Sequence, residues 1–259
     1  MQAKFTKYSA NGNHFVLFEK ALALSKERMA QICHPAFGVG ADGVAMLSEE
    51  PGFDFRFRLW NSDGGEAEMC GNAARAAAWH FMQNRRLSEV KFKTMNGAYQ
   101  ARMEEGRLWI EMSEHRQDLN LPPDLFNSYS RWFYIDTGVP HLVLEVPDVH
   151  AIDLMTEAPR LRHHRSFPRG TNVDFISVTD PAQSNVQLRV FERGVEGETW
   201  SCGTGVAAVA WACRAFYGWS GDMSVYTKGG EHRVRIDAQG HLWYSGEVVR
   251  VFDGTLADA

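Results

Sequence analysis

The chain has 259 residues, a formal net charge of −5 and 44% hydrophobic residues, a size typical of two domains or of one large domain. The acidic balance excludes the basic surface that nucleic-acid binding needs, so we expect a small-molecule ligand and no nucleic-acid partner. The sequence contains no apolar run as long as a membrane span and no signal-peptide core near its start. We therefore expect a cytoplasmic protein with no membrane partner.

In chain order, the first half predicts strands, one alanine-rich helix and further strands. Residues 12–19 form a short apolar run and residues 53–60 alternate between apolar and polar side chains, and both patterns are typical of strands. The stretch "CGNAARAAAW" (70–79) follows a polar loop and opens a predicted helix over 72–86. Its small alanine side chains indicate a helix that is buried on most faces. Strands around a turn at Gly106 complete this half.

The second half predicts the same elements in the same order. An apolar run at 138–145 and an alternating run at 185–191 predict strands. The stretch "CGTGVAAVAW" (202–211) then opens a predicted helix over 204–218, and strands surround a turn at Gly240. Between the halves, the polar segment 113–129 contains a Pro-Pro pair and predicts a linker.

The two cysteine turns therefore belong to a repeat that extends through the chain. Cys70 and Cys202 lie about half a chain length apart, and Asp42 matches Asp174 at the same spacing. Two homologous domains are the simplest explanation.

A cysteine at the start of a helix lies beside unpaired backbone amides and the positive end of the helix dipole, both of which favour a thiolate. The same amides can bind a carboxylate, and Gly71 and Gly203 let the backbone approach it closely. If the halves face each other, the two thiols lie on opposite sides of a bound substrate, which suits inversion at a carbon by two-base proton transfer. The alternative is that both cysteines are inert core thiols, but each follows a polar, acidic loop.

The other two cysteines and the lack of known motifs limit which metals or cofactors the protein could use. Cys213 is three helical turns from Cys202, too far to belong to the same site. We therefore expect Cys213, like Cys33, to lie in the core. No CxxC pair or His/Cys spacing indicates a metal, and no pyridoxal-phosphate or flavin motif is recognisable, so we expect neither metal nor cofactor.

The motifs "NSDGGEAEMCGNAAR", "FPRGTNVDF" and "ERGVEGETWSCGTGVAA" give the chain a resemblance to the diaminopimelate epimerases over almost its whole length. That family is cofactor-independent, uses two cysteines, and converts LL-diaminopimelate to the meso isomer in lysine and peptidoglycan synthesis. The resemblance implies an α/β (α+β) fold of two pseudo-symmetric domains, each a mixed sheet wrapped around a central helix. It also implies that the C-terminal strand returns to the first domain, so we expect domains of 1–117 plus 248–259, carrying Cys70, and 118–247, carrying Cys202.

The resemblance also implies roles for individual residues. Cys70 and Cys202 resemble the catalytic acid–base pair, and His141 and Glu192 resemble the catalytic polar residues that flank the reacting carbon. The implied substrate contacts are Asn13, Asn61, Gly71, Asn72, Asn172, Glu192, Arg193, Gly203 and Thr204. Among them Gly71, Asn72, Gly203 and Thr204 would hold the carboxylate next to the reacting carbon, and a guanidinium such as Arg193 suits a distal carboxylate.

Four positions depart from the family pattern and leave other functions open. His14 stands where the family usually has Asp, Gly43 where many members have Gln, Ala73 where Gly is usual, and Val139 where Asn is usual. A racemase of the same fold acting on another amino acid is therefore the closest alternative. A thiol–disulfide redox protein and a binding module without catalysis are the alternatives from other classes. The sequence leaves a homodimer open.

Overall fold

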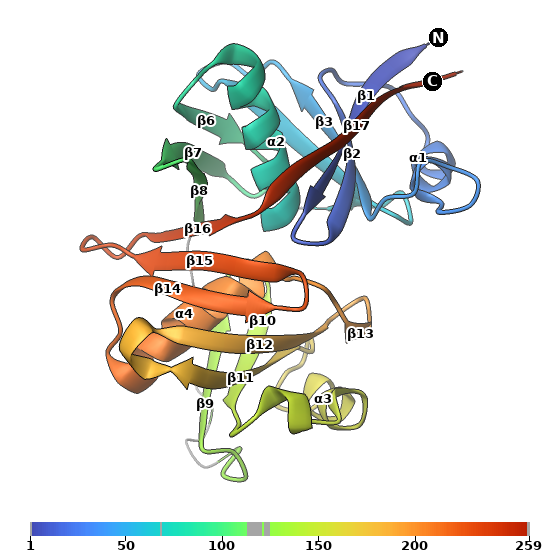
Figure 1. The fold of residues 1–259 in the computed structure, drawn as a ribbon. Coiled ribbons are helices and arrows are strands. Elements are labelled where there is room, and N and C mark those ends of the chain that lie inside the picture. The colour runs from blue at the N-terminus through green and yellow to red at the C-terminus, as the bar shows by residue number, and fades with distance from the viewer. Residues whose placement is uncertain (1, 68, 113–120, 122–124, 258–259) are drawn as a thin grey trace. The chain divides into compact units, whose positions relative to one another are not determined.

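The computed structural model describes residues 2–67, 69–112, 121 and 125–257, and the chain divides into two compact units. Unit 1 comprises Met1–Glu111 and Ser245–Ala259, and unit 2 comprises Met112–Tyr244. Figure 1 shows unit 1 in blue to green, together with the dark red C-terminal strand. Most of the predicted linker at 113–129 lies outside the described residues.

Unit 1 is built on a mixed sheet with a helix before its third strand and another after its fifth. The β2–β3 and β4–β6 pairs are parallel, and the pairs β1–β2, β3–β4, β4–β5, β6–β7, β7–β8 and β1–β17 are antiparallel. The elements are β1 (Ala3–Ala10), β2 (Asn13–Phe18), α1 (Lys26–Cys33), β3 (Gly43–Ser48), β4 (Phe55–Asn61), β5 (Glu66–Ala67), α2 (Gly71–Arg85), β6 (Glu89–Lys93), β7 (Ala98–Glu104), β8 (Arg107–Met112) and β17 (Val248–Leu256).

Unit 2 repeats this element order and six of these pairings. Its β10–β11 and β12–β14 pairs are parallel, and β9–β10, β11–β12, β12–β13 and β14–β15 are antiparallel. The elements are β9 (Arg131–Asp136), β10 (Pro140–Glu145), η1 (Val149–Ala151), α3 (Leu154–Arg162), β11 (Asn172–Asp180), η2 (Pro181–Gln183), β12 (Asn185–Glu192), β13 (Gly197–Glu198), α4 (Gly203–Tyr217), β14 (Gly221–Thr227), β15 (Gly230–Ile236) and β16 (Leu242–Gly246). The shared topology confirms the predicted fold class of two homologous α/β halves.

The helices α2 and α4 lie against the sheets of their own units, as their composition predicts. Ala73, Ala74 and Ala77 of α2 are fully buried, and so are Ala208 and Ala210 of α4. Small side chains let α2 pack against β1, β2, β3, β4 and β6, and let α4 pack against β9, β10, β11 and β15. Both helices begin one residue before the predicted start, which makes the preceding cysteine the N-cap in each case.

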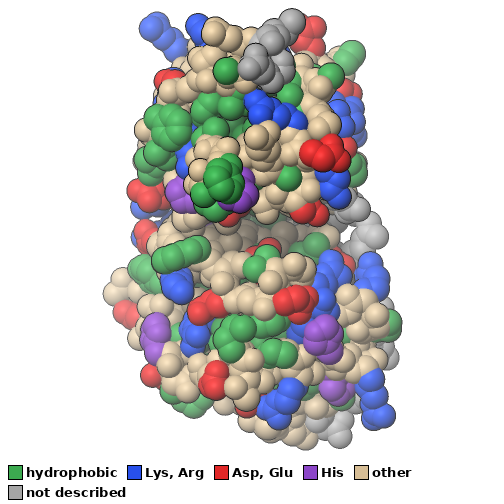
Figure 2. Space-filling model, turned by 90° about the vertical axis from the view of Figure 1, so that its right-hand side faces the viewer, with side chains coloured by type: hydrophobic (Ala, Val, Ile, Leu, Met, Phe, Trp, Pro, Cys, Tyr) green, Lys and Arg blue, Asp and Glu red, His purple; other side chains and the backbone are tan. Residues whose placement is uncertain are grey.

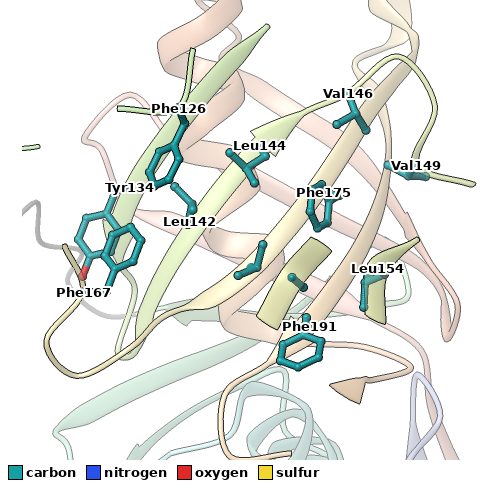
Figure 3. Packing of buried hydrophobic residues seen from close by; sticks show 12 residues of the cluster. Phe126, Tyr134, Leu142, Leu144, Val146, Val149, Leu154, Phe167, Phe175 and Phe191 are labelled. Carbon is teal, nitrogen blue, oxygen red and sulfur yellow. The ribbon is translucent and has the colours of Figure 1, made fainter. Parts of the chain in front are cut away.

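The core of unit 2 is a cluster of apolar side chains shown in Figure 3. Phe175 of β11 is fully buried at its centre. Phe126 belongs to the same cluster, with its ring 5.3 Å from that of Trp132 and 6.1 Å from that of Phe167. The end of the predicted linker is therefore part of the packed core, because burial of Phe126 outweighs the polar character of its neighbours.

The C-terminal strand returns to the first element of the chain. β17 pairs with β1 from Ala3 to Ala10, with a register shift between Lys7 and Tyr8. None of the helices in the described part of the chain combines the length and the apolar character that a membrane span needs. On the face drawn in Figure 2, Lys and Arg side chains are interspersed with Asp and Glu side chains.

The packing of unit 2 predicts that Phe175→Ala lowers the free energy of unfolding by about 3–5 kcal/mol, because it leaves a cavity in the core. Urea denaturation followed by circular dichroism measures the change. Phe37→Ala is the matched control, because the Phe37 side chain is 81% exposed and its loss should change stability by no more than about 0.5 kcal/mol. A similar midpoint shift for both variants would contradict the assignment of the core.

Candidate active site

The first turn of α2 presents Cys70 at its N-cap. Cys70 has an extended backbone (φ −144°, ψ 119°), and its carbonyl accepts the first helical hydrogen bond from the Ala74 amide at 2.9 Å. The Cys70 side chain makes no capping hydrogen bond. The amides of the first helical turn, beginning at Gly71, have no partner within the helix, so they can bind an anion.

A polar network ties this helix turn to the loop between β1 and β2. The Asn72 side chain is buried and its amide donates to Oδ1 of Asn13. Arg75, which is fully buried, donates to Oδ1 of Asn72 at 2.7 Å, to Oδ1 of Asn11 at 2.9 Å and to the carbonyl of Glu247 at 3.2 Å. Arg75 thus holds the first turn of α2, the β1–β2 loop and the C-terminal segment in one arrangement.

Asp42 fixes the other side of the β1–β2 loop. Its Oδ2 accepts from the backbone amide of His14 at 2.7 Å and from Nδ2 of Asn13 at 3.4 Å. The next residue, Gly43, lies in register with Phe15 on one side and with Asn61 on the other. A Cβ on Gly43 would lie 2.7 Å from the carbonyl oxygen of Trp60. This backbone arrangement leaves no room for a side chain at position 43.

Unit 2 presents Cys202 in the equivalent position at the start of α4. Cys202 is the N-cap, with an extended backbone (φ −126°, ψ 109°), and its carbonyl accepts from the Val206 amide at 3.0 Å. Its Sγ lies 3.2 Å from Oγ1 of Thr204. Thr137 donates to the carbonyl of Thr204 at 2.9 Å, which anchors the first turn to the end of β9.

A buried histidine–aspartate pair lies beside this turn. Nδ1 of His141 is 2.6 Å from Oδ2 of Asp174, and both side chains are fully buried. Nε2 of His141 is 3.0 Å from Oγ1 of Thr204. The parallel pairing of β10 with β11 places His141 opposite Asn172, whose Nδ2 donates to the carbonyl of Pro140 at 2.8 Å.

Asn172 also connects this pair to the turn after β12. Its Oδ1 accepts from the backbone amide of Arg193 at 2.7 Å, and the Arg193 guanidinium donates to the carbonyl of Arg169 at 3.2 Å. Glu192 precedes Arg193 and ends β12, where it pairs with Gly197 of β13. These contacts position the Glu192–Arg193 turn relative to His141.

The structure reverses one expectation for Cys202. The helix start was expected to favour a thiolate, but burial raises the pKa of the Cys202 thiol well above its usual range, and the charges of Glu192 and Asp174 raise it further. The hydrogen bond with Thr204 and the one from the Gly205 amide act in the opposite direction and do not compensate. Cys202 is 6% exposed, so desolvation outweighs the helix dipole and the residue is a thiol at neutral pH.

The other two cysteines lie in the core, as predicted, and all four are free thiols. Burial raises the pKa of Cys33 to about 11 and that of Cys213 to about 12. Neither thiol is ionised near neutral pH. Within the described ranges, no three His, Cys, Asp or Glu side chains gather as a metal site would require.

Each unit thus brings some of the predicted residues together. Unit 1 joins Asn13 and Asn72 by a hydrogen bond at the start of the helix that follows Cys70, and leaves Asn61 exposed at the end of β4. Unit 2 links Cys202, Thr204, His141 and Asn172 in one network, with Glu192 and Arg193 on the adjoining turn. Asp174, Asp42 and Arg75 had no predicted role in the site. The repeat offered a signal for the first two, because Asp42 and Asp174 match between the halves.

Two halves of one topology, each with a cysteine at the start of a buried helix, define a fold class that solved structures share. A phenazine biosynthesis protein of the PhzF family from Bacillus anthracis is similar in structure, with a TM-score of 0.72, 15% identity and 99% of both chains covered. A hydroxyproline epimerase from Agrobacterium vitis is also similar, with a TM-score of 0.69, 14% identity, and 99% of this chain and 93% of that chain covered.

Sequence comparison identifies the family within this class. The family model described as diaminopimelate epimerase matches residues 5–117 and 133–251. A diaminopimelate epimerase of Methanocella arvoryzae is 34% identical over 98% of this chain and 96% of that protein, and one of Nitratiruptor is 36% identical over 96% and 97%. The chain belongs to the diaminopimelate epimerase family and is an isomerase that acts on a small molecule.

We predict that Glu192→Gln lowers the pKa of the Cys202 thiol, because the substitution removes a negative charge that opposes ionisation of this thiol. The ultraviolet absorbance of the Cys202 thiolate is obtained by subtracting the absorbance of the matching Cys202→Ser protein. In Glu192→Gln this absorbance should rise at a lower pH than in the unmodified protein. Glu196→Gln is the matched control, because Glu196 is exposed and paired with Arg162. A thiolate transition at unchanged or higher pH in Glu192→Gln would contradict the assignment.

Proposed function

We propose that the chain inverts the α-carbon of diaminopimelate, interconverting the LL and meso isomers, by two-base proton transfer between Cys70 and Cys202. The observation that carries the proposal is the pair of cysteine N-caps, one at the start of the buried helix in each unit. Inversion needs one group that removes a proton and a second that supplies one, and two thiols meet this need.

The first turns of the two helices supply the charge stabilisation that the reaction requires. A proton on the carbon beside a carboxylate is very weakly acidic, and its removal moves negative charge onto that carboxylate. Backbone amides at Gly71 and Asn72, and at Gly203 and Thr204, are aimed out of the helix starts and can hold this charge. We therefore assign these four residues to the carboxylate next to the reacting carbon. Thiols and amides then supply acid, base and charge stabilisation, so we include no cofactor.

The state of the Cys202 thiol follows from its surroundings. Burial, Glu192 and Asp174 keep Cys202 protonated in the free protein. We therefore assign Cys202 as the first proton donor and Cys70 as the first base. His141 and Glu192 flank Cys202 and adjust its proton affinity. In the opposite direction of the reaction, Cys202 becomes the base.

Side chains farther from the helix starts would bind the distal end of the substrate and so select it. Arg193 is held by Asn172 through its backbone, and its guanidinium can bind a carboxylate in a bidentate manner. We assign Asn13, Asn61 and Asn172 as further substrate contacts.

Two positions support a second candidate, a racemase of another amino acid. Position 43 has no room for a side chain, because a Cβ would approach the Trp60 carbonyl to 2.7 Å. Val139 offers no hydrogen bond from its side chain. The distal contacts are therefore fewer than the family pattern implies, and a shorter substrate is compatible with the remaining ones. Racemisation of a panel of amino acids, scored by exchange of the Cα proton in D₂O, separates the two candidates.

We further assign residues 1–117 with 248–259 to the half that carries Cys70, and residues 118–247 to the half that carries Cys202. With diaminopimelate as substrate, the reaction belongs to lysine and peptidoglycan synthesis, and we place the enzyme in the cytoplasm.

The proposal predicts that Cys70→Ser and Cys202→Ser each reduce epimerisation of LL-diaminopimelate by more than about 100-fold, because a hydroxyl is too weakly acidic to serve as the base. Chiral chromatography of the product, with reductant present, measures the loss. Cys213→Ala is the control, since its thiol lies in the core. Substantial turnover by either serine variant would exclude the two-base mechanism, and activity that requires a Cys70–Cys202 disulfide would favour a redox protein.

Arg193→Leu should reduce kcat/KM for diaminopimelate at least about tenfold, because it removes a charge-assisted interaction of roughly 1.5–3 kcal/mol. Amino acids without a distal carboxylate should lose less. Arg165→Leu is the matched control, because Arg165 is an exposed arginine on a nearby loop. Equal losses for long and short substrates would show that Arg193 acts on the structure and not on the distal carboxylate.

A further inference from the structure

Unit 2 contains a continuous chain of hydrogen bonds that runs from the Cys202 thiol to a buried carboxylate. Its three links join Cys202 Sγ to Thr204 Oγ1 (3.2 Å), Thr204 Oγ1 to His141 Nε2 (3.0 Å), and His141 Nδ1 to Asp174 Oδ2 (2.6 Å). His141 and Asp174 are fully buried and Cys202 is 6% exposed. The four side chains come from α4 and its cap, from β10 and from β11.

One arrangement of donors makes this chain continuous in a single direction. With the Asp174 carboxylate as the acceptor, Nδ1 of His141 carries the proton and Nε2 accepts. The Thr204 hydroxyl therefore donates to Nε2, and its oxygen accepts from the Cys202 thiol. All donors point from the thiol toward Asp174, so one concerted shift can move a proton along the whole path.

We propose that Thr204 and Asp174 are positioning residues of a proton relay that converts the Cys202 thiol to a thiolate. The Sγ–H proton passes to Oγ1 of Thr204 while the hydroxyl proton of Thr204 passes to Nε2 of His141. The products are a thiolate, an unchanged threonine and an imidazolium that donates Nδ1–H to the Asp174 carboxylate. No other bond changes. The proposal rests on the acid–base role of Cys202 proposed above.

The surroundings of Cys202 explain why the thiol needs an internal proton acceptor. Burial and the charges of Glu192 and Asp174 raise the pKa of this thiol, so ionisation without a partner is unfavourable. The strands that pack against α4, and the adjoining β12, carry among their titratable groups Asp136 on β9, His141 on β10, Asp174 on β11, Glu192 on β12 and His232 on β15. His232 bonds to Ser201 and Tyr244, and Asp136 accepts from the Gly138 amide. His141 is the basic group that the Thr204 hydroxyl connects to the thiol.

Gly205 provides the space for this arrangement. A Cβ at position 205 would lie 3.0 Å from Oδ1 of Asp174 and 3.4 Å from both Cε1 of His141 and Cβ of Cys202. In unit 1 the matching aspartate, Asp42, accepts from the backbone amide of His14. The histidine–aspartate arrangement of unit 2 is therefore a specialisation of that half.

Elimination of halide from diaminopimelate analogues halogenated on Cβ tests the relay, because elimination needs only the thiol that removes the Cα proton. The stereoisomer whose elimination is lost in Cys202→Ser but kept in Cys70→Ser reports on Cys202, and the other reports on Cys70. Thr204→Val keeps the backbone amide assigned to the carboxylate but removes the hydroxyl. It should slow the Cys202-dependent isomer at least about tenfold and the other isomer less than about twofold, and Thr204→Ser should restore most of the rate.

Asp174→Asn should cause the same isomer-selective loss, and ¹⁵N NMR should show His141 leaving the Nδ1–H tautomer. Thr171→Val is the matched control, since Thr171 is a fully buried threonine whose hydroxyl bonds to the Asn172 carbonyl at 2.9 Å. The relay is overturned by equal slowing of both isomers, by unchanged rates in Thr204→Val, or by an Nε2–H tautomer in the unmodified protein. Failure of the unmodified enzyme to act on diaminopimelate would instead refute the proposed function, while the tautomer measurement would still test the relay.

Discussion

The start of a buried helix is the constraint on which each half of this protein depends. The first turn of an α-helix leaves backbone amides without partners inside the helix, and Cys70 makes no capping hydrogen bond with its side chain. Each half therefore keeps a set of donors directed at the space beside a thiol. The alanine-rich body of each helix lets the surrounding strands approach closely, which keeps that turn in a fixed position.

The same burial that fixes the turn also sets the chemistry of the thiol. At Cys202 the loss of water and the charges of Glu192 and Asp174 outweigh the helix amides, so the proton is retained. In the mechanism that we propose, a retained proton suits a group whose first task is to donate it. The reverse direction of that mechanism requires a nearby base, and His141 lies one hydroxyl group away.

The two halves share a topology but use their polar residues differently. In unit 1 the matching aspartate, Asp42, accepts a hydrogen bond from the backbone amide of His14. Buried Arg75 joins three segments by donating to one backbone carbonyl and to two side-chain amide oxygens. In unit 2 the aspartate holds a histidine side chain next to the helix start. The two halves thus share a helix that begins at a cysteine, while the matching aspartate contacts a backbone amide in one half and a histidine side chain in the other.

The repeat, the order of the elements, the helix starts at Cys70 and Cys202 to within one residue, and the family can all be predicted from the amino-acid sequence. These features follow from local propensity and from motifs that are contiguous in the chain. The tertiary structure alone decided the features that depend on distant segments. The His141–Asp174 bond exists because β10 and β11 pair in parallel. A side chain at position 43 is excluded because the Trp60 carbonyl of β4 occupies the space that its Cβ would need. The raised pKa of Cys202 likewise results from burial and from charges on β11 and β12, whereas the local sequence signals only the helix dipole.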